Sequence, residues 1–156
     1  MAGPDGCLAC ELSQGVRELP GGLIHATEYW RVEHCVGPLG VGTLIVKPVR
    51  HVEHVAELTS DEAGELGPLL RLTSAVVNDI CRPQQVYVCL WSHGPTHIHF
   101  VVQPETDEAM RAHGAYGPDL QMAMFADGAA PDPIRVAEVA VVARGIFARR
   151  IAASMQ

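Results

Sequence analysis

The sequence has few positively charged residues and no long apolar run. Its 11 Lys and Arg against 18 Asp and Glu give a formal net charge of −7, which argues against a nucleic acid or an anionic membrane as the main partner. Because no run of about 18 apolar residues is present, no transmembrane helix is predicted. The N-terminal residues also lack a basic region followed by an apolar stretch, so we expect no secretory signal and a cytosolic protein.

Common nucleotide-binding and nucleophile motifs are absent as well. The sequence contains no Walker-type phosphate loop, no G-x-G-x-x-G turn, no nucleophile elbow and no internal repeat. A nucleotide pocket is still compatible with the acidic charge, because a few backbone N–H groups suffice to bind phosphate. The length of 156 residues favours a single domain over residues 1–156.

Cysteine is present in an odd number, five, so a disulfide framework is not expected in a reducing compartment. The close pair Cys7-Leu8-Ala9-Cys10 has the C-x-x-C spacing that directs two thiolates to one Zn²⁺. Such a pair is half a zinc site and needs two further ligands. Two alternatives remain open: ordinary buried thiols, or a redox dithiol, which would normally follow a strand that is not predicted here.

The pattern of apolar residues predicts an α+β fold. Strands are expected at residues 23–25, 29–36 and 43–47 as an antiparallel meander, and at 85–90 and 97–104 as a hairpin. Thr59 and Glu62 form a capping box that begins a long helix ending at Arg82-Pro83. Shorter helices are expected at 107–113 and from Pro118, and a last helix begins at Asp132-Pro133.

The stretch from His93 to Pro104 is a candidate site, because His97 and His99 alternate with apolar residues. In a strand the two side chains would lie on one face, about 7 Å apart. Two imidazoles on a sheet face cost free energy unless they bind a metal or perform chemistry. The alternative is a solvated face with incidental histidines.

Taken together, four segments resemble the histidine-triad superfamily of nucleotide hydrolases and transferases. The segments are CLAC at 7–10, GPLGVGTLIVKPVRH at 37–51, the following VEHVAELTSDE, and HIHFVVQP at 97–104. The resemblance implies a histidine-triad-like α+β fold, with a five-stranded antiparallel sheet, a main helix on one face and a homodimer. It covers about residues 7–104, and the remainder, 105–156, is expected to be a C-terminal helical extension.

The resemblance also implies roles for the histidine strand. With Pro104 setting the register, His97 takes the first triad position, His99 becomes the nucleophile that attacks an α-phosphorus, and Val101 takes the third position. In the slipped register His97 would be the nucleophile and His99 the third member. His93, where many members have a phosphate-binding glutamine, is a second catalytic candidate.

Substrate-contact candidates come from the same comparison. Ser92 and the backbone of the Gly94 turn are candidates for phosphate binding. Cys35 falls where an acidic or amide side chain usually binds ribose, Thr43 where a fourth histidine usually stands, and Val101 where the third triad residue assists the leaving group. These three positions depart from the family pattern, so general acid assistance, typically worth about 10²–10⁴-fold, is weakened unless His93 supplies it.

The branch of the family with an N-terminal C-x-x-C implies a closed, structural Zn²⁺ site. Its ligands in this sequence would be Cys7, Cys10, His51 and His97. His34, His54 and His93 are substitutes if His97 is engaged elsewhere.

Three functions are compatible with these residues. The first is a hydrolase or transferase acting on a nucleotide α-phosphate, with a dinucleoside polyphosphate or nucleoside phosphoramidate as substrate. The second is a non-catalytic nucleotide-binding or interaction protein, favoured by the departures at Val101, Thr43 and Cys35. The third, a thiol oxidoreductase, rests only on Cys7 and Cys10.

Overall fold

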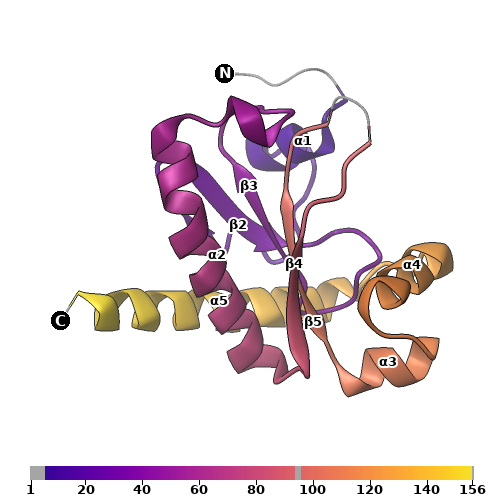
Figure 1. Cartoon of the computed structure of the whole chain (residues 1–156). Helices are drawn as coiled ribbons and strands as arrows, with labels where there is room; N and C mark the ends of the chain where they lie inside the picture. The colour runs from indigo at the N-terminus through magenta and orange to yellow at the C-terminus, as the bar shows by residue number, and fades with distance from the viewer. Residues whose placement is uncertain (1–5, 94–95, 156) are drawn as a thin grey trace.

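The computed structural model describes residues 6–93 and 96–155, and these form one antiparallel five-stranded sheet with helices on both faces (Figure 1). The strand order is β1-β2-β3-β5-β4. The strands are β1 (His25–Ala26), β2 (Trp30–His34), β3 (Leu44–Pro48), β4 (Gln85–Cys89) and β5 (Phe100–Glu105). The helices are α1 (Leu8–Gln14), the 3₁₀ turn η1 (Val55–Glu57), α2 (Ser60–Cys81), α3 (Asp107–His113), α4 (Gly117–Asp127) and α5 (Pro133–Ser154). The predicted α+β fold, with its meander and its β4–β5 hairpin, is confirmed.

Both long helices begin at the predicted caps. The Thr59 hydroxyl accepts a hydrogen bond from the Glu62 backbone N–H, and the Glu62 carboxylate accepts one from the Thr59 backbone, which completes the capping box of α2. The Asp132 carboxylate accepts from the backbone N–H of Ile134 at the start of α5. Each cap satisfies backbone donors that the first helical turn cannot pair internally.

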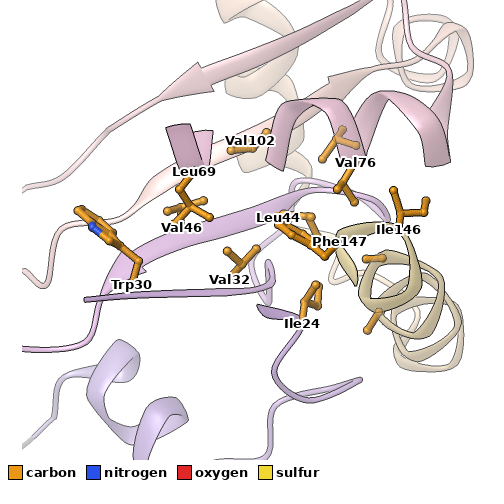
Figure 2. Packing of buried hydrophobic residues seen from close by; sticks show 13 residues of the cluster. Ile24, Trp30, Val32, Leu44, Val46, Leu69, Val76, Val102, Ile146 and Phe147 are labelled. Carbon is orange, nitrogen blue, oxygen red and sulfur yellow. The ribbon is translucent and has the colours of Figure 1, made fainter. Parts of the chain in front are cut away.

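One face of the sheet is covered by α2 and α5, which cross each other (Figure 1). Figure 2 shows Leu69 and Val76 of α2 and Ile146 and Phe147 of α5 gathered over the strand residues. The buried members of this core are Ile24, Trp30, Val32, Leu44, Val46, Leu69, Val76, Val77, Val102, Ala140, Ala143, Ile146 and Phe147. The segment after Pro104 therefore contributes to the main core through α5.

The opposite face carries a smaller core and the functional region. Val101 and Ile45, which alternate with core residues of the first face, pack here against Leu120 and Met124 of α4. Helix α1 lies over the same face, because the Lys47 side chain reaches from β3 to the carbonyl of Ala9. The space between α1 and α4 is left open above the sheet.

One strand prediction is wrong at its beginning, because His97 and His99 precede β5 instead of lying within it. The ladder between β3 and β5 starts at the pair Val46 and Phe100. Beyond it, the Pro48 carbonyl faces the Nε2 atom of His97, and the Ile98 N–H donates to the Val52 carbonyl. Residues 97–99 are thus held by the loop after β3. Within the described residues, no helix has the length and apolarity needed to cross a membrane.

Candidate functional site

Four side chains predicted as zinc ligands come together in the structure. One ligand atom from each of Cys7, Cys10, His51 and His97 lies within 4.8 Å of the other three. The Sγ atom of Cys10 is 3.5 Å from Nδ1 of His51 and 3.4 Å from Nδ1 of His97. These residues come from the start of α1, the loop after β3 and the segment before β5.

The distances fit a tetrahedral zinc site. With Zn–S bonds of about 2.3 Å and Zn–N bonds of about 2.0–2.1 Å, tetrahedral geometry separates sulfur and nitrogen by about 3.6 Å. The two sulfur–nitrogen distances at Cys10 are close to this value. Two thiolates and two neutral imidazoles also make a ligand set that Zn²⁺ prefers. The site is therefore a candidate zinc centre.

The C-x-x-C pair is presented by the first turn of α1. Cys7 is the N-cap, and its carbonyl accepts the Glu11 N–H at 2.9 Å. This short helix was not predicted from the sequence. The Lys47 ammonium group donates to the Ala9 carbonyl at 2.8 Å and so fixes the turn that carries both thiols to the sheet.

His51 lies in a loop that is attached to the N-terminus of α2. The Arg50 guanidinium donates to both carboxylate oxygens of Glu62, at 2.6 and 2.8 Å. These hydrogen bonds hold the pKa of Glu62 below its usual value. The Nε2 atom of His51 lies 3.5 Å from Glu53 Oε1, so a carboxylate faces the nitrogen opposite to the metal side, an arrangement that orients a ligand ring.

His97 is held by the backbone on its other side. Its Nε2 is 2.9 Å from the Pro48 carbonyl, which can only accept, so this nitrogen carries the hydrogen and Nδ1 presents its lone pair to the cluster. Burial lowers the pKa of His97 to about 4. Burial also raises the pKa of the Cys10 thiol to about 11. The positive charge of a bound metal ion would offset this cost, because metal-bound thiols are deprotonated.

A cavity of about 720 Å³ opens beside the metal ligands, which is the size of a typical small-molecule site. It lies on the sheet face between α1 and α4. Its lining includes Leu8, Ala9, Leu12, Glu33, Cys35, Val36, Leu39, Ile45, Lys47, Glu53, Trp91, Thr96, His97, His99, Val101, Gln121 and Phe125.

His99 lines this cavity and is not part of the four-residue metal cluster. Its Nδ1 is 3.1 Å from the carbonyl of His97. A carbonyl accepts only, so Nδ1 carries the hydrogen and the lone pair of the neutral ring is on Nε2. Such an imidazole can act as a nucleophile or as a hydrogen-bond acceptor.

Only some of the remaining predicted site residues line the cavity. Cys35 and Val101 line the cavity, and burial raises the pKa of the Cys35 thiol to about 11. Thr43 is fully buried, its hydroxyl donates to the Leu39 carbonyl, and it is not among the lining residues. Ser92 and His93 are exposed and are not among the lining residues. Gly94 lies outside the described residues.

Several lining residues were not found from the sequence. Glu33 and Lys47 lie in the cavity wall as a buried ion pair, with 2.6 Å between Oε1 and Nζ. Lys47 is the only lysine of the chain and interrupts an apolar strand. A lone lysine in such a strand is a sequence signal that could have marked this position. Trp91 and Gln121 are joined by an indole N–H to amide oxygen bond of 3.0 Å. Gln121 and Phe125 come from α4, and no sequence motif marked them.

Comparison with known proteins identifies the fold. No family model and no curated protein matches the sequence. A zinc-bound histidine triad family protein from Mycobacterium smegmatis is similar over 95% of this chain and 97% of its own, with a TM-score of 0.68 and 16% identity. A hypothetical histidine triad nucleotide-binding protein from Sulfolobus tokodaii covers 92% and 93%, with a TM-score of 0.70 and 15% identity.

The chain has the histidine-triad fold. A third similar structure is a histidine-triad-like protein from Bartonella henselae, described as involved in cell-cycle regulation, with a TM-score of 0.69 and 10% identity over 94% of this chain and 99% of that one. In all three, nearly the whole of this chain is matched. The similarity to these three structures therefore extends beyond residue 104 into the helices after β5.

Proposed function

We propose that this protein is a histidine-triad hydrolase or nucleotidyl transferase that acts at the α-phosphate of a nucleotide through a nucleotidyl intermediate on His99. The substrate class is a dinucleoside polyphosphate or a nucleoside phosphoramidate. The observation that supports it most directly is the ring of His99, which lines the cavity with its Nδ1 hydrogen-bonded to the His97 carbonyl.

In the proposed first step, the Nε2 lone pair of His99 forms a bond to the α-phosphorus, and the bond from phosphorus to the leaving group breaks. The leaving group departs with the electron pair and takes a proton from solvent. In the second step, water or another acceptor attacks phosphorus, the phosphorus–nitrogen bond breaks, and the acceptor loses a proton to solvent. The covalent intermediate replaces one difficult displacement by two easier ones.

In this proposal the residues of the candidate zinc centre have a structural role and no catalytic one. Four protein ligands leave no open coordination position, which is the pattern of a structural site. Bound Zn²⁺ would supply a cross-link between α1, the loop after β3 and the segment before β5. That segment carries His99, so the cross-link fixes the backbone from which the nucleophile projects.

A second candidate function is a non-catalytic nucleotide-binding protein, and Val101 favours it. Val101 is buried among Ile45, Leu120 and Met124. Its aliphatic side chain has no ionisable proton to give to a leaving group. Gln121 lines the cavity, but its amide is engaged with Gln103 and Trp91. The enzyme we propose is therefore slow, or acts on substrates whose leaving group needs no acid.

The test is turnover of nucleoside phosphoramidates and dinucleoside polyphosphates by the wild type and by His99→Asn. We expect product formation to fall to background in His99→Asn and to be unchanged in His113→Asn, a control in α3 outside the cavity lining. Acid quenching during turnover should trap a nucleotidyl group on the peptide that contains His99. Unchanged turnover in His99→Asn, or an adduct on another peptide, would remove His99 from the mechanism. Nucleotide binding without any product would favour the non-catalytic alternative.

We also propose a homodimer in the cytosol. β4 is an edge strand of the sheet, with Val88 exposed on it, and an unpaired edge can join a second sheet. All five cysteines are free thiols, which suits a reducing compartment. Mass measurement by light scattering tests the dimer, and a monomer at micromolar concentration would contradict it.

A further inference from the structure

Helix α1 (Leu8–Gln14) is too short to hold its position by itself. Isolated helices of fewer than about 12 residues are marginal in water, and α1 has 7 residues. Its N-cap, Cys7, makes no side-chain capping hydrogen bond, and its two buried residues are Cys10 and Leu12. The C-x-x-C pair and one wall of the cavity therefore belong to a helix that depends on contacts with the rest of the fold.

Among the described residues, two polar links join α1 to the sheet and its loops. One is the contact of Cys10 Sγ with His51 and His97, which is part of the candidate zinc centre. The other is the Lys47 ammonium group, whose Nζ donates to the Ala9 carbonyl at 2.8 Å. Ala9 lies between the two thiol-bearing residues of the C-x-x-C pair. Lys47 therefore holds the thiol-bearing turn through a contact that requires no metal.

Glu33 orients the lysine toward this turn. Glu33 of β2 and Lys47 of β3 are 3% and 0% exposed, and Lys47 Nζ lies 2.6 Å from Glu33 Oε1. A buried ion pair is a weak source of stability, since the desolvation of both charges offsets their attraction. Its fixed geometry does restrict a lysine side chain, which otherwise has high rotamer entropy. The pair is therefore suited to direct the ammonium group to one acceptor, the Ala9 carbonyl.

We propose that Lys47, oriented by Glu33, is a positioning residue that docks α1 on the sheet before metal binds. The docked helix then presents its two thiols to the histidine ligands and its apolar side chains to the cavity. A binding site that is formed in only a fraction of the molecules loses apparent affinity in proportion to that fraction. Zinc affinity therefore depends on Lys47, although Lys47 is not a metal ligand. The inference is independent of the reaction proposed for His99.

The test compares the zinc affinity of the full-length wild type with that of the double variant Glu33→Leu, Lys47→Met, by chelator competition on the zinc-loaded proteins. The double variant removes both charges, so no unpaired charge remains buried, and the Ala9 carbonyl keeps the Ser13 hydroxyl as a donor at 2.9 Å. Residues that orient metal ligands from outside typically change metal affinity by about 10–100-fold when replaced. We therefore expect zinc to bind at least about tenfold more weakly to the double variant. Affinities within about threefold of each other would overturn the inference.

Ser13→Ala is the matched control, because Ser13 donates to the same carbonyl from within α1 and so cannot tie the helix to the sheet. Its zinc affinity should stay within about threefold of the wild-type value. Weakening equal to that of the double variant would show that the lysine has no special role and would overturn the inference. The visible absorption of the Co²⁺-saturated proteins should be the same in all three, because the four ligands are unchanged. An altered spectrum in the double variant would mean altered ligation in place of a shifted docking equilibrium, which would also overturn the inference.

Amide hydrogen exchange on the chelator-treated, full-length proteins measures the docking itself. The Glu11 N–H donates to the Cys7 carbonyl at 2.9 Å, so it is protected only while α1 is formed. We expect α1 amides to stay protected in the metal-free wild type and to exchange at least about tenfold faster in the double variant, with α2 unchanged. Unprotected α1 amides in the metal-free wild type would overturn the inference, and this result requires no variant to fold. Failure of the wild type to bind zinc would overturn the inference together with the metal centre.

Discussion

Zinc binding should stabilise the protein against heat, and loss of the Cys10 thiol should abolish this effect. Cys10 is 7% exposed and contacts both histidine ligands through Sγ. A serine hydroxyl at this position is not deprotonated near neutral pH and is a poor zinc ligand. Cys10→Ser therefore leaves three ligands and removes the thiol that contacts both histidines, so we expect zinc binding to be lost.

The size of the effect follows from mass action. A metal that binds only the folded state at about 100 times its dissociation constant stabilises it by about 2.7 kcal/mol. For a chain of this length, about 1 kcal/mol shifts Tm by about 2–4 °C. We therefore expect zinc to raise Tm of the wild type by about 5–11 °C under these conditions.

The assay is thermal unfolding of chelator-treated protein with and without added Zn²⁺, together with zinc content after dialysis. Cys35→Ser is the matched control, because Cys35 is also 7% exposed but lies outside the metal cluster. We expect Cys35→Ser to keep one zinc per chain and the full shift, even if its basal Tm is lower. The same zinc-dependent shift in Cys10→Ser and Cys35→Ser would refute the metal site.

Three further predictions concern the fold around the site. The Nε2 atom of His34 accepts the Gly42 N–H, and burial lowers the pKa of His34. The ring in the unfolded chain binds a proton below about pH 6.5, so the free energy of unfolding should fall as pH drops through that value. Urea unfolding at several pH values measures this slope, and we expect a smaller slope in His34→Gln. Phe147→Ala should cost about 3–5 kcal/mol in the same assay, because this ring is 1% exposed in the main core; a cost below about 1 kcal/mol would show that α5 is dispensable to the core. Thr59→Ala should cost about 1 kcal/mol through loss of the α2 cap, and Thr59→Ser, which keeps the hydroxyl, should restore most of it.

The sequence was sufficient for features that depend on neighbours along the chain. The Thr59–Glu62 capping box and the Asp132 cap were found because a cap is made by residues within three positions of one another. The meander and the β4–β5 hairpin were found because alternation and turn residues are local signals. The predicted beginning of β5 was wrong, because the alternation of apolar residues continues through His97 while the partner strand β3 ends at Pro48.

The cavity shows the limit of such reasoning. Its α4 wall, with Gln121 and Phe125, carries no motif, and the Glu33–Lys47 pair joins residues that are distant in sequence and diagonal across two strands. Residues on different elements meet only after the sheet register and the helix packing are set.

The sequence by itself therefore determined the α+β class, the helix caps and the four zinc-ligand candidates, the last through a resemblance in motif spacing. The tertiary structure alone decided that the ligand atoms of Cys7, Cys10, His51 and His97 converge within 4.8 Å, that His99 is left out of that cluster, and that α5 completes the main core. The physical reason is that spacing along the chain limits which side chains are able to meet, whereas burial and register decide which of them do.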